Sequence, residues 1–230
     1  MRNRTLVWIV TSLVVVAASV VWRRVERTST TRSVTVFSAK WLGLPIVIPR
    51  DAIESERRAA QMLRSTLAKS SGRPESSFPI ETEQASGPRR AIFVGATQRA
   101  GDFLANGAKA PFDMQVGARV RGESVLIRSE RRESIESAAS WFLETRLGAR
   151  WFMPGPLGEI VPRRGALSLA EGTETVRPGF ISRHLGVGGP GGAEWYARSR
   201  LEARFDHGHN LVNIFRPEDL EQVLAQAARS

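Results

Sequence analysis

The chain has 230 residues, of which 42% are hydrophobic and 24% are charged, a composition typical of a folded protein of one or two domains. It contains no cysteine, which excludes disulfide bonds, thiolate metal sites and catalysis by a cysteine nucleophile. The formal net charge is +10, and such an excess raises nucleic acid or an anionic surface as partners.

Most of the positive charge is arginine, and it is dispersed along the chain, partly in pairs. Such pairs include Arg57-Arg58, Arg89-Arg90, Arg131-Arg132 and Arg163-Arg164. A nucleic-acid surface more often shows a dense basic run, or aromatic residues interleaved with basic ones. The pattern favours a solvated, arginine-rich surface over a binding patch, and nucleic acid is not expected as a partner.

Residues 6–22, LVWIVTSLVVVAASVVW, form an uncharged apolar run with arginines on both sides. As a helix, the run reaches most of the way across a hydrocarbon core of about 30 Å. It is a signal peptide or a membrane anchor; Arg23 directly after it favours retention, and a buried core helix fits less well. Residues 1–33 are therefore expected to be an anchor or signal helix with a polar linker. The protein is expected outside the cytoplasm, membrane-anchored or secreted.

From residue 34 to residue 104 the pattern alternates between strands and helices. Strands are predicted at residues 34–37, 45–49, 78–82 and 91–95. The last of them is apolar throughout, as in a central strand that is covered on both faces. Asp51 and Glu54 resemble a D-x-x-E capping box that starts a helix ending at Gly72. A second, short helix is predicted at residues 98–104.

The next segment predicts a hairpin, a helix and further short strands. The hairpin and the later strands are placed at residues 115–121, 124–128, 151–153, 159–162 and 167–169. Between them, apolar residues recur at helical spacing from Ile135 to Leu147, and Gly148 suits a left-handed C-terminal cap. The order indicates an α/β domain over residues 34–178, a sheet with helices packed on it.

After residue 178 the pattern predicts the opening units of a second parallel α/β architecture. Strands are expected at residues 180–185 and 211–215, and helices at 193–204 and 217–229. The loop GVGGPGG between the first strand and helix matches G-x-G-x-x-G at Gly186, Gly188 and Gly191. Pro190 removes a backbone donor from that loop, so a flexible glycine loop is favoured and a dinucleotide site is a distant alternative.

His207 and His209 lie beside Asp206 in the segment DHGHN, and imidazole with carboxylate suits zinc or a similar ion. A third ligand is not evident, because His184 is the only other histidine. A polar cluster that hydrogen-bonds a ligand or a neighbouring loop is favoured over a metal site.

Paired carboxylates are the signature of glycoside hydrolysis, and Glu159 and Glu194 are candidates by residue type alone. Glu159 follows the central helix and its aromatic corner and is more consistent with a structural role. No nucleophile elbow with a Ser-His-Asp arrangement occurs. No catalytic residue is assigned, and neither a metal nor a cofactor is expected.

Several segments together resemble a known family. They are PIVIPRDAIESERRAAQMLRSTLAKSSG, AIFVG, WFLETRLGARWFMPGPLGEIVP, PGFISRHL and HGHN. They resemble the N-terminal part of an uncharacterised bacterial glycoside-hydrolase-like family, over roughly residues 45–215. Its first domain is similar to domain 2 of β-hexosaminidases and to the N-terminal domain of α-glucuronidases. The most specific of these segments are LGARWFMPGPLGEIVP and HGHN.

The resemblance implies a non-catalytic first domain that packs against a (β/α)₈ barrel beginning near Phe180. In family 20 glycoside hydrolases an arginine on the first barrel strand binds the sugar, and Arg183 is the position that matches it. The alternative is that Arg183 forms a salt bridge at the barrel mouth. The HGHN segment would lie near the same mouth. The substrate-binding residues implied are Arg183, His184, His207, His209 and Asn210.

A barrel takes about 250 residues, whereas residues 179–230 supply only its first units. The chain is therefore expected to be a fragment, a mispredicted reading frame or a stand-alone accessory module, without glycosidase activity of its own. Its expected function is to support a carbohydrate-active barrel, with carbohydrate, the membrane and that barrel as partners. A stand-alone carbohydrate-binding or cell-surface interaction module is the alternative.

Overall fold

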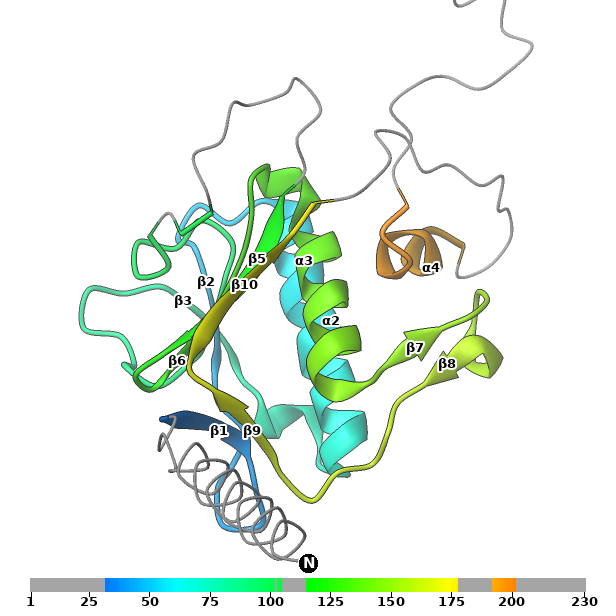
Figure 1. Ribbon diagram of the computed structural model, residues 1–230, viewed down its shortest axis with the longest axis horizontal. Coiled ribbons are helices and arrows are strands. Elements are labelled where there is room, and N and C mark those ends of the chain that lie inside the picture. Colours follow the sequence, from blue (N-terminus) through cyan, green and yellow to red (C-terminus); the bar gives the residue numbers. More distant parts are fainter. Residues whose placement is uncertain (1–31, 102, 105–114, 178–191, 202–230) are drawn as a thin grey trace, which may run out of the picture.

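The computed structural model describes residues 32–101, 103–104, 115–177 and 192–201 (Figure 1). The strands are β1 (Ser33–Phe37), β2 (Ile46–Ile48), β3 (Ile80–Thr82), β4 (Ile92–Val94), β5 (Val116–Arg121), β6 (Ser124–Ser129), β7 (Arg150–Trp151), β8 (Glu159–Ile160), β9 (Leu167–Ala170) and β10 (Gly172–Val176). The α-helices are α2 (Glu54–Ser71), α3 (Ile135–Phe142) and α4 (Gly192–Arg198). A π-helical turn, η3 (Leu143–Leu147), extends α3, and short 3₁₀ turns are η1 (Glu75–Ser77), η2 (Arg132–Ser134) and η4 (Pro156–Gly158).

Six strands form the central sheet in the order β10-β5-β6-β4-β2-β3. Strands β3, β2, β4 and β6 run parallel to one another, whereas β5 pairs antiparallel with β6 and β10 pairs antiparallel with β5. The mixed α/β sheet confirms the fold class expected for this part of the chain. Strand β4 lies inside the sheet with every residue buried, as its unbroken apolar sequence predicted.

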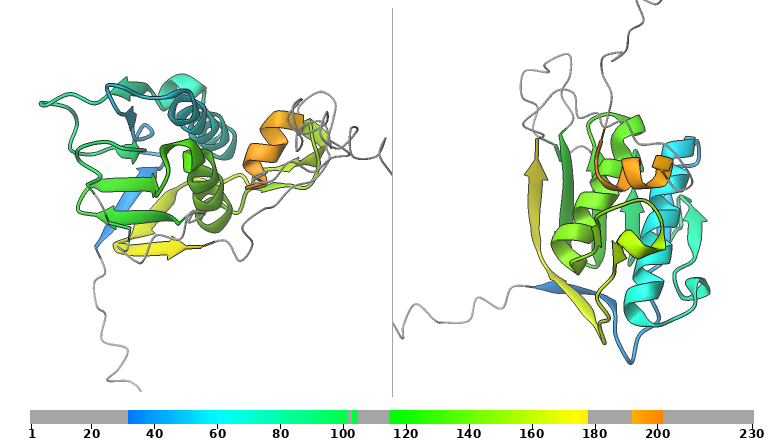
Figure 2. Two further views of the ribbon diagram at one scale, coloured as in Figure 1. Left: turned by 90° about the horizontal axis from the view of Figure 1, so that it is seen from above. Right: turned by 90° about the vertical axis from the view of Figure 1, so that its right-hand side faces the viewer.

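The two faces of this sheet are built differently. Both long helices, α2 and α3, pack on one face (Figure 2), where alternate strand residues such as Val125 and Ile127 join the main core. The intervening residues point to the opposite face and form a small apolar cluster. Its members are Val47, Ala91, Phe93, Ala100, Phe103, Leu104 and Leu126.

Helix α2 begins two residues later than the D-x-x-E pattern indicated, so that prediction was wrong. Ile53 occupies the N-cap position, and the carboxylate of Glu56, not Glu54, accepts its backbone N–H at 3.0 Å. Asp51 instead accepts a hydrogen bond from Arg132 at 2.9 Å. Three acids lie near the helix start, Asp51, Glu54 and Glu56, and of these only Glu56 is buried. Arg132 pairs with both Asp51 and Glu56, a tertiary contact that the local pattern did not indicate.

The end of the second helical segment follows the sequence prediction. Gly148 has φ 84°, in the left-handed region, and its N–H donates to the carbonyl of Leu143. The helix predicted at residues 98–104 does not form among the described residues of that segment, where the chain makes a turn. Glu83 explains the turn, because its carboxylate accepts the N–H groups of Gln98 and Arg99.

The remaining elements lie outside the central sheet. Strands β1 and β9 form an antiparallel pair below it, and β7 and β8 form an arm, residues 150–160. This arm and helix α4 lie on the far side of α2 and α3 from the sheet (Figures 1 and 2). The predicted apolar N-terminal run and the strand at 180–185 fall outside the described residues. Among the helices that the structure does describe, none has the length and apolar character needed to cross a bilayer.

Candidate functional site

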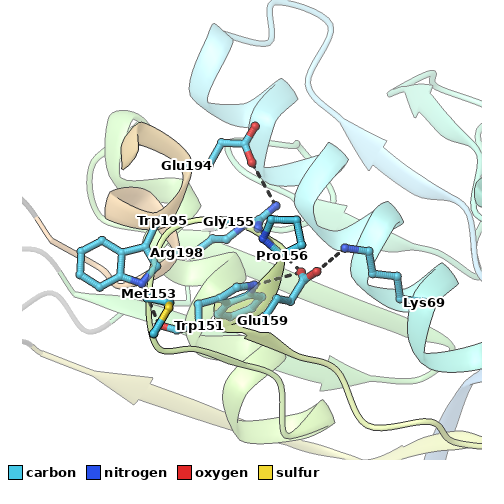
Figure 3. A pocket seen from close by; sticks show the side chains of 9 residues that line it. All are labelled: Lys69, Trp151, Met153, Gly155, Pro156, Glu159, Glu194, Trp195 and Arg198. Carbon is cyan, nitrogen blue, oxygen red and sulfur yellow. Dashed lines mark hydrogen bonds and ion pairs between the residues drawn. The ribbon is translucent and has the colours of Figure 1, made fainter. Parts of the chain in front are cut away.

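A pocket of about 190 Å³ opens between helix α4, the β7–β8 arm and the C-terminal half of α2 (Figure 3). Its walls combine two indole rings, two cations and two carboxylates with the turn of the arm. The lining residues are Lys69, Trp151, Met153, Gly155, Pro156, Glu159, Glu194, Trp195 and Arg198. Segments far apart in the sequence therefore meet here.

The arm owes its shape to a tight turn between its two strands. Gly155 has φ 84°, and the N–H of Gly158 donates to its carbonyl at 3.2 Å. The N–H of Phe152 then donates to the carbonyl of Gly158 at 2.8 Å. A Cβ on Gly158 would lie 2.1 Å from the carbonyl oxygen of Met153, so a side chain cannot fit there without a shift of the backbone. The turn sets Glu159 directly opposite Trp151 in the β7–β8 pair.

Glu159 is the polar centre of the pocket. Its carboxylate accepts hydrogen bonds from the indole Nε1 of Trp151 at 3.1 Å and from Nζ of Lys69, and lies 3.7 Å from the guanidinium of Arg198. Burial by itself raises the pKa of Glu159, but the hydrogen bonds from Lys69 and Trp151 and the nearby charges outweigh burial. The pKa of this carboxyl therefore lies below its ordinary value, and Glu159 is ionised at neutral pH.

Helix α4 closes the pocket through contacts to both the arm and α3. The indole Nε1 of Trp195 donates to the carbonyl of Trp151 at 2.9 Å, as Figure 3 shows. The hydroxyl of Ser140 on α3 donates to the carbonyl of Arg198. The guanidinium of Arg198 lies 5.8 Å from the ring centre of Trp151. These contacts fix the helix from both sides.

The two carboxylates singled out by residue type, Glu159 and Glu194, do line the same pocket. Arg198 lies between them, 3.7 Å from Glu159 and 3.5 Å from Glu194. A glycosidase acid needs a raised pKa to hold its proton at neutral pH, and the pKa of Glu159 is lowered instead. The arrangement suits electrostatic joining of two segments better than general acid catalysis.

The other residues predicted as sites fall outside the described part of the chain. Arg183, His184, His207, His209 and Asn210 all lie in residues 178–191 or 202–230, so their roles stay predictions, as does the G-x-G-x-x-G loop. Within the described ranges no group of three or more histidine, aspartate or glutamate side chains is arranged to hold a metal ion.

Sequence reasoning did not foresee the roles of Lys69, Trp195 and Arg198. Lys69 lies 90 positions before Glu159, and no local pattern connects the two. A weak signal existed for Arg198, because it follows Glu194 by four residues, the spacing of an ion pair on a helix.

No protein-family model matches the chain, and no curated protein matches its sequence. Among solved structures, it is similar to the N-acetyl-β-hexosaminidase of Streptomyces plicatus, with 14% identity and a TM-score of 0.40 over 66% of this chain and 24% of that one. The GH20 β-N-acetylhexosaminidase of Streptomyces coelicolor A3(2) gives 16% identity and a TM-score of 0.40 over 66% and 26%.

A third similar structure is the GH20 exo-β-N-acetylglucosaminidase of Vibrio harveyi, solved with N-acetylglucosamine. It gives 18% identity and a TM-score of 0.33 over 66% of this chain and 18% of that one. The chain thus spans about a quarter or less of the length of these enzymes. Over two-thirds of its own length, it bears a distant structural resemblance to part of the GH20 β-hexosaminidases.

Proposed function

We propose that the α/β domain is a non-catalytic accessory domain of an exported or membrane-anchored, carbohydrate-active protein. Its role is to hold the segment after residue 178, which we propose to be the start of a barrel. The single observation that carries this proposal is the use made of the polar groups in the pocket. They join helix α4 to the domain, and the pocket's carboxylates, cations and indoles bond one another at this junction.

The contacts at the junction come from four separate elements. Trp195 binds the backbone of the arm, Arg198 approaches Glu159, and Ser140 of α3 binds the last turn of α4. Beyond the helix, Arg200 forms an ion pair with Glu144 at 2.7 Å. A segment held through an indole, a carbonyl and two carboxylates is oriented as well as attached, as a supporting domain requires.

The arm also carries an exposed apolar surface. Four large side chains on it are more than half exposed: Phe152, Met153, Leu157 and Ile160. Exposed apolar side chains grouped on one short element are typical of a surface that another part of a protein covers. This grouping supports the view that the arm lies at the boundary with further structure.

Two measurements on the 230-residue chain test the proposal. The chain should not turn over aryl glycosides. In Trp195→Ala, amide hydrogen exchange at residues 192–201 should accelerate, since the bond to the Trp151 carbonyl and the packing of the indole are lost. Trp41→Ala is the control, because that indole stacks under Arg90 elsewhere in the molecule.

Either of two results would overturn the proposal. The first is glycoside turnover that disappears in Arg183→Ala, which would make the chain an enzyme. The second is unchanged hydrogen exchange at residues 192–201 in Trp195→Ala, which would mean that the pocket does not hold the helix.

A stand-alone carbohydrate-binding module is the second candidate, and the composition of the pocket favours it. The pocket presents indole surface beside Lys69 and Arg198, whose charges are balanced by Glu159 and Glu194, as a neutral, hydroxyl-rich ligand would need. Binding of uncharged glycans on an array, lost in Glu194→Ala, would establish it. Glu194 is exposed, so this variant leaves the fold intact.

A further inference from the structure

A second hollow, of about 560 Å³, lies on the sheet face that α2 and α3 leave uncovered. Its walls hold four arginines and one acid, with a floor of small and apolar residues. The lining residues are Arg89, Arg99, Ala100, Gly101, Arg119, Arg121, Gly122, Glu123, Ser124 and Leu126.

The strand register explains why arginines gather here. Arg119 lies opposite Leu126, and Arg121 lies opposite Ser124, in the β5–β6 hairpin. These residues share one face, because the alternate residues Ala118 and Val120 belong to the core under the helices. Arg89 comes from the loop before β4 and Arg99 from the turn after it, so three separate stretches of chain supply the charges.

Two of the four guanidinium groups, those of Arg99 and Arg119, are positioned by uncharged partners. Arg119 lies 4.7 Å from the ring centre of Phe103 and donates from Nε to the hydroxyl of Thr173 at 2.9 Å. Arg99 lies 5.6 Å from the ring centre of Phe93. Aromatic faces attract guanidinium but do not cancel its charge. These two cations are therefore held in place while their charge stays available.

The nearby acids do not neutralise them. Glu83 accepts backbone N–H groups at the turn of residues 98–99, and Glu171 accepts the N–H of Gly122. In the described residues, neither of these acids nor Glu123 forms an ion pair with an arginine of the hollow. Three positive charges therefore remain in the lining after Glu123 is counted against the four arginines.

We infer that this hollow binds an acidic glycan, a saccharide that carries carboxylate or sulfate groups. Guanidinium forks match the two oxygens of such groups, and the hollow lies within the roughly 300–1,000 Å³ of small-molecule sites. That the anion is a saccharide rests on the proposed function. The hollow would thus bind an acidic substrate of a carbohydrate-active protein, away from the pocket that surrounds Glu159.

The surroundings of the arginines favour a glycan over a bilayer or a nucleic acid. Among the residues that the structure describes on this face, the apolar ones, including Phe93 and Leu126, are buried beneath the cations and do not project to insert among lipids. The rings of Phe93 and Phe103 face guanidinium groups and are not open for stacking with bases.

The test is a calorimetric titration of the full chain with a uronate oligosaccharide, a sulfated oligosaccharide and a neutral oligosaccharide of the same length. The uronate and sulfate arms identify the acidic group that is preferred. The test variant is Arg89→Gln/Arg121→Gln, because neither side chain has a bonding partner among the described residues. The control is Arg57→Gln/Arg163→Gln, which removes the same charge from exposed positions on the side of the molecule that carries α2.

An acidic oligosaccharide should bind, and the neutral one should not. The test variant should bind at least about tenfold more weakly, since charge-assisted hydrogen bonds are lost, whereas the control should stay within about twofold because only long-range charge changes. Equal losses in the two variants, or no binding of either acidic oligosaccharide, would overturn the inference. So would binding of anionic phospholipid vesicles or duplex DNA that the acidic oligosaccharides do not displace.

The outcome is separable from that of the proposed function. The accessory role is measured by glycoside turnover and by hydrogen exchange at residues 192–201, neither of which depends on Arg89 or Arg121. A chain that keeps a stable junction but ignores acidic glycans would refute only the inference about the hollow.

Discussion

The two faces of the central sheet treat charge in opposite ways. On the helical side, arginines meet carboxylates: Arg58 binds Glu136 at 2.7 Å, and Arg132 binds the buried Glu56 at 2.7 Å. On the open side, Arg99 and Arg119 lie over aromatic rings without a carboxylate partner in the described residues. Both faces carry arginines, yet among the described residues Arg58 and Arg132 are paired with acids whereas Arg99 and Arg119 are not.

Arginine therefore has two roles in this molecule. On the helical side it satisfies acids that hold elements together, and removing either partner leaves an uncompensated charge in a protected place. On the open side the side chains of Arg89 and Arg121 bond no group in the described residues, so we expect these two to contribute little to the fold. We therefore expect substitutions of these two arginines to change binding more than stability.

The largest difference between the two faces is expected for a pair of neighbouring core substitutions on β6. Ile127 is 0% exposed under the helices, and Leu126 is 6% exposed at the floor of the open hollow. Ile127→Ala should lower the free energy of unfolding by about 3–4 kcal/mol and Leu126→Ala by about 2 kcal/mol, since water can fill the second cavity. Urea denaturation of both variants measures the contrast, and equal losses would mean that the faces are equally packed.

The next test removes the buried acid of the helical side. Glu56 accepts the N–H groups of Ile53 and Ala96 and pairs with Arg132. Glu56→Ala should therefore cost about 3 kcal/mol in the free energy of unfolding, because three donors lose their acceptor. Glu54→Ala, an exposed acid in the same helical turn, should change it by less than about 0.5 kcal/mol. Similar values for the two would refute the special role of Glu56.

A substitution at Gly95, which packs against the carboxylate of Glu56, also tests the role of this acid. Gly95 has φ 84°, and a Cβ there would lie 2.3 Å from Oε1 of Glu56. Gly95→Ala should cost about 2–3 kcal/mol, combining backbone strain with the displaced carboxylate. Gly122→Ala is the control, with φ 60° and no atom within 4 Å of the added Cβ, and should cost about 1 kcal/mol from strain alone. Thermal denaturation compares the two, and a Gly122 variant as unstable as the Gly95 variant would contradict the clash.

The pH dependence of stability tests the role of Glu159 in the pocket beside helix α4. The folded pKa of Glu159 lies below the ordinary 4.5, so the folded state binds this proton less readily than the unfolded state. Its stabilising contribution is present above about pH 5 and is lost as the pH falls through the folded pKa. With Lys69 half exposed, the effect should stay below about 1 kcal/mol. The difference in free energy of unfolding between the natural chain and Glu159→Gln should narrow from pH 6 to pH 3. A difference that widens would mean that the pKa of Glu159 is raised on folding and not lowered.

The smallest effect is expected for the open-side arginines. Arg89→Gln/Arg121→Gln should change the free energy of unfolding by less than about 0.5 kcal/mol, because neither side chain bonds another group in the described structure. Chemical denaturation at two salt concentrations measures this change. A loss as large as that of Glu56→Ala would show that these arginines hold the fold together.

Much of the domain could be predicted from local patterns. The β-branched segment at Ile46–Ile48, the hairpin at Val116–Ser129 and the glycine that ends η3 at Gly148 all form where expected. Each depends on residues close in sequence: alternation, a short turn, or a conformation available mainly to glycine. The turn at residues 98–101 escaped because Glu83, from another segment, binds its N–H groups.

The candidate site was harder to foresee, since its residues come from distant parts of the chain. Glu159 and Glu194 were singled out by residue type, but the partners that set their roles, Lys69 and Arg198, were not. The hollow of the open face shows the same limit. Arg89, Arg99 and Arg119 lie in different segments and appear dispersed along the chain, yet the sheet brings them to one hollow.

Local sequence thus specified the strands, the helix ends and the apolar faces of this protein, because propensity and periodicity act over a few residues. Which acid caps α2, which carboxylate is held by Lys69 and which arginines remain without an acid all depended on the packing of distant elements. Charges interact according to distance in space, and only the folded sheet and helices set those distances.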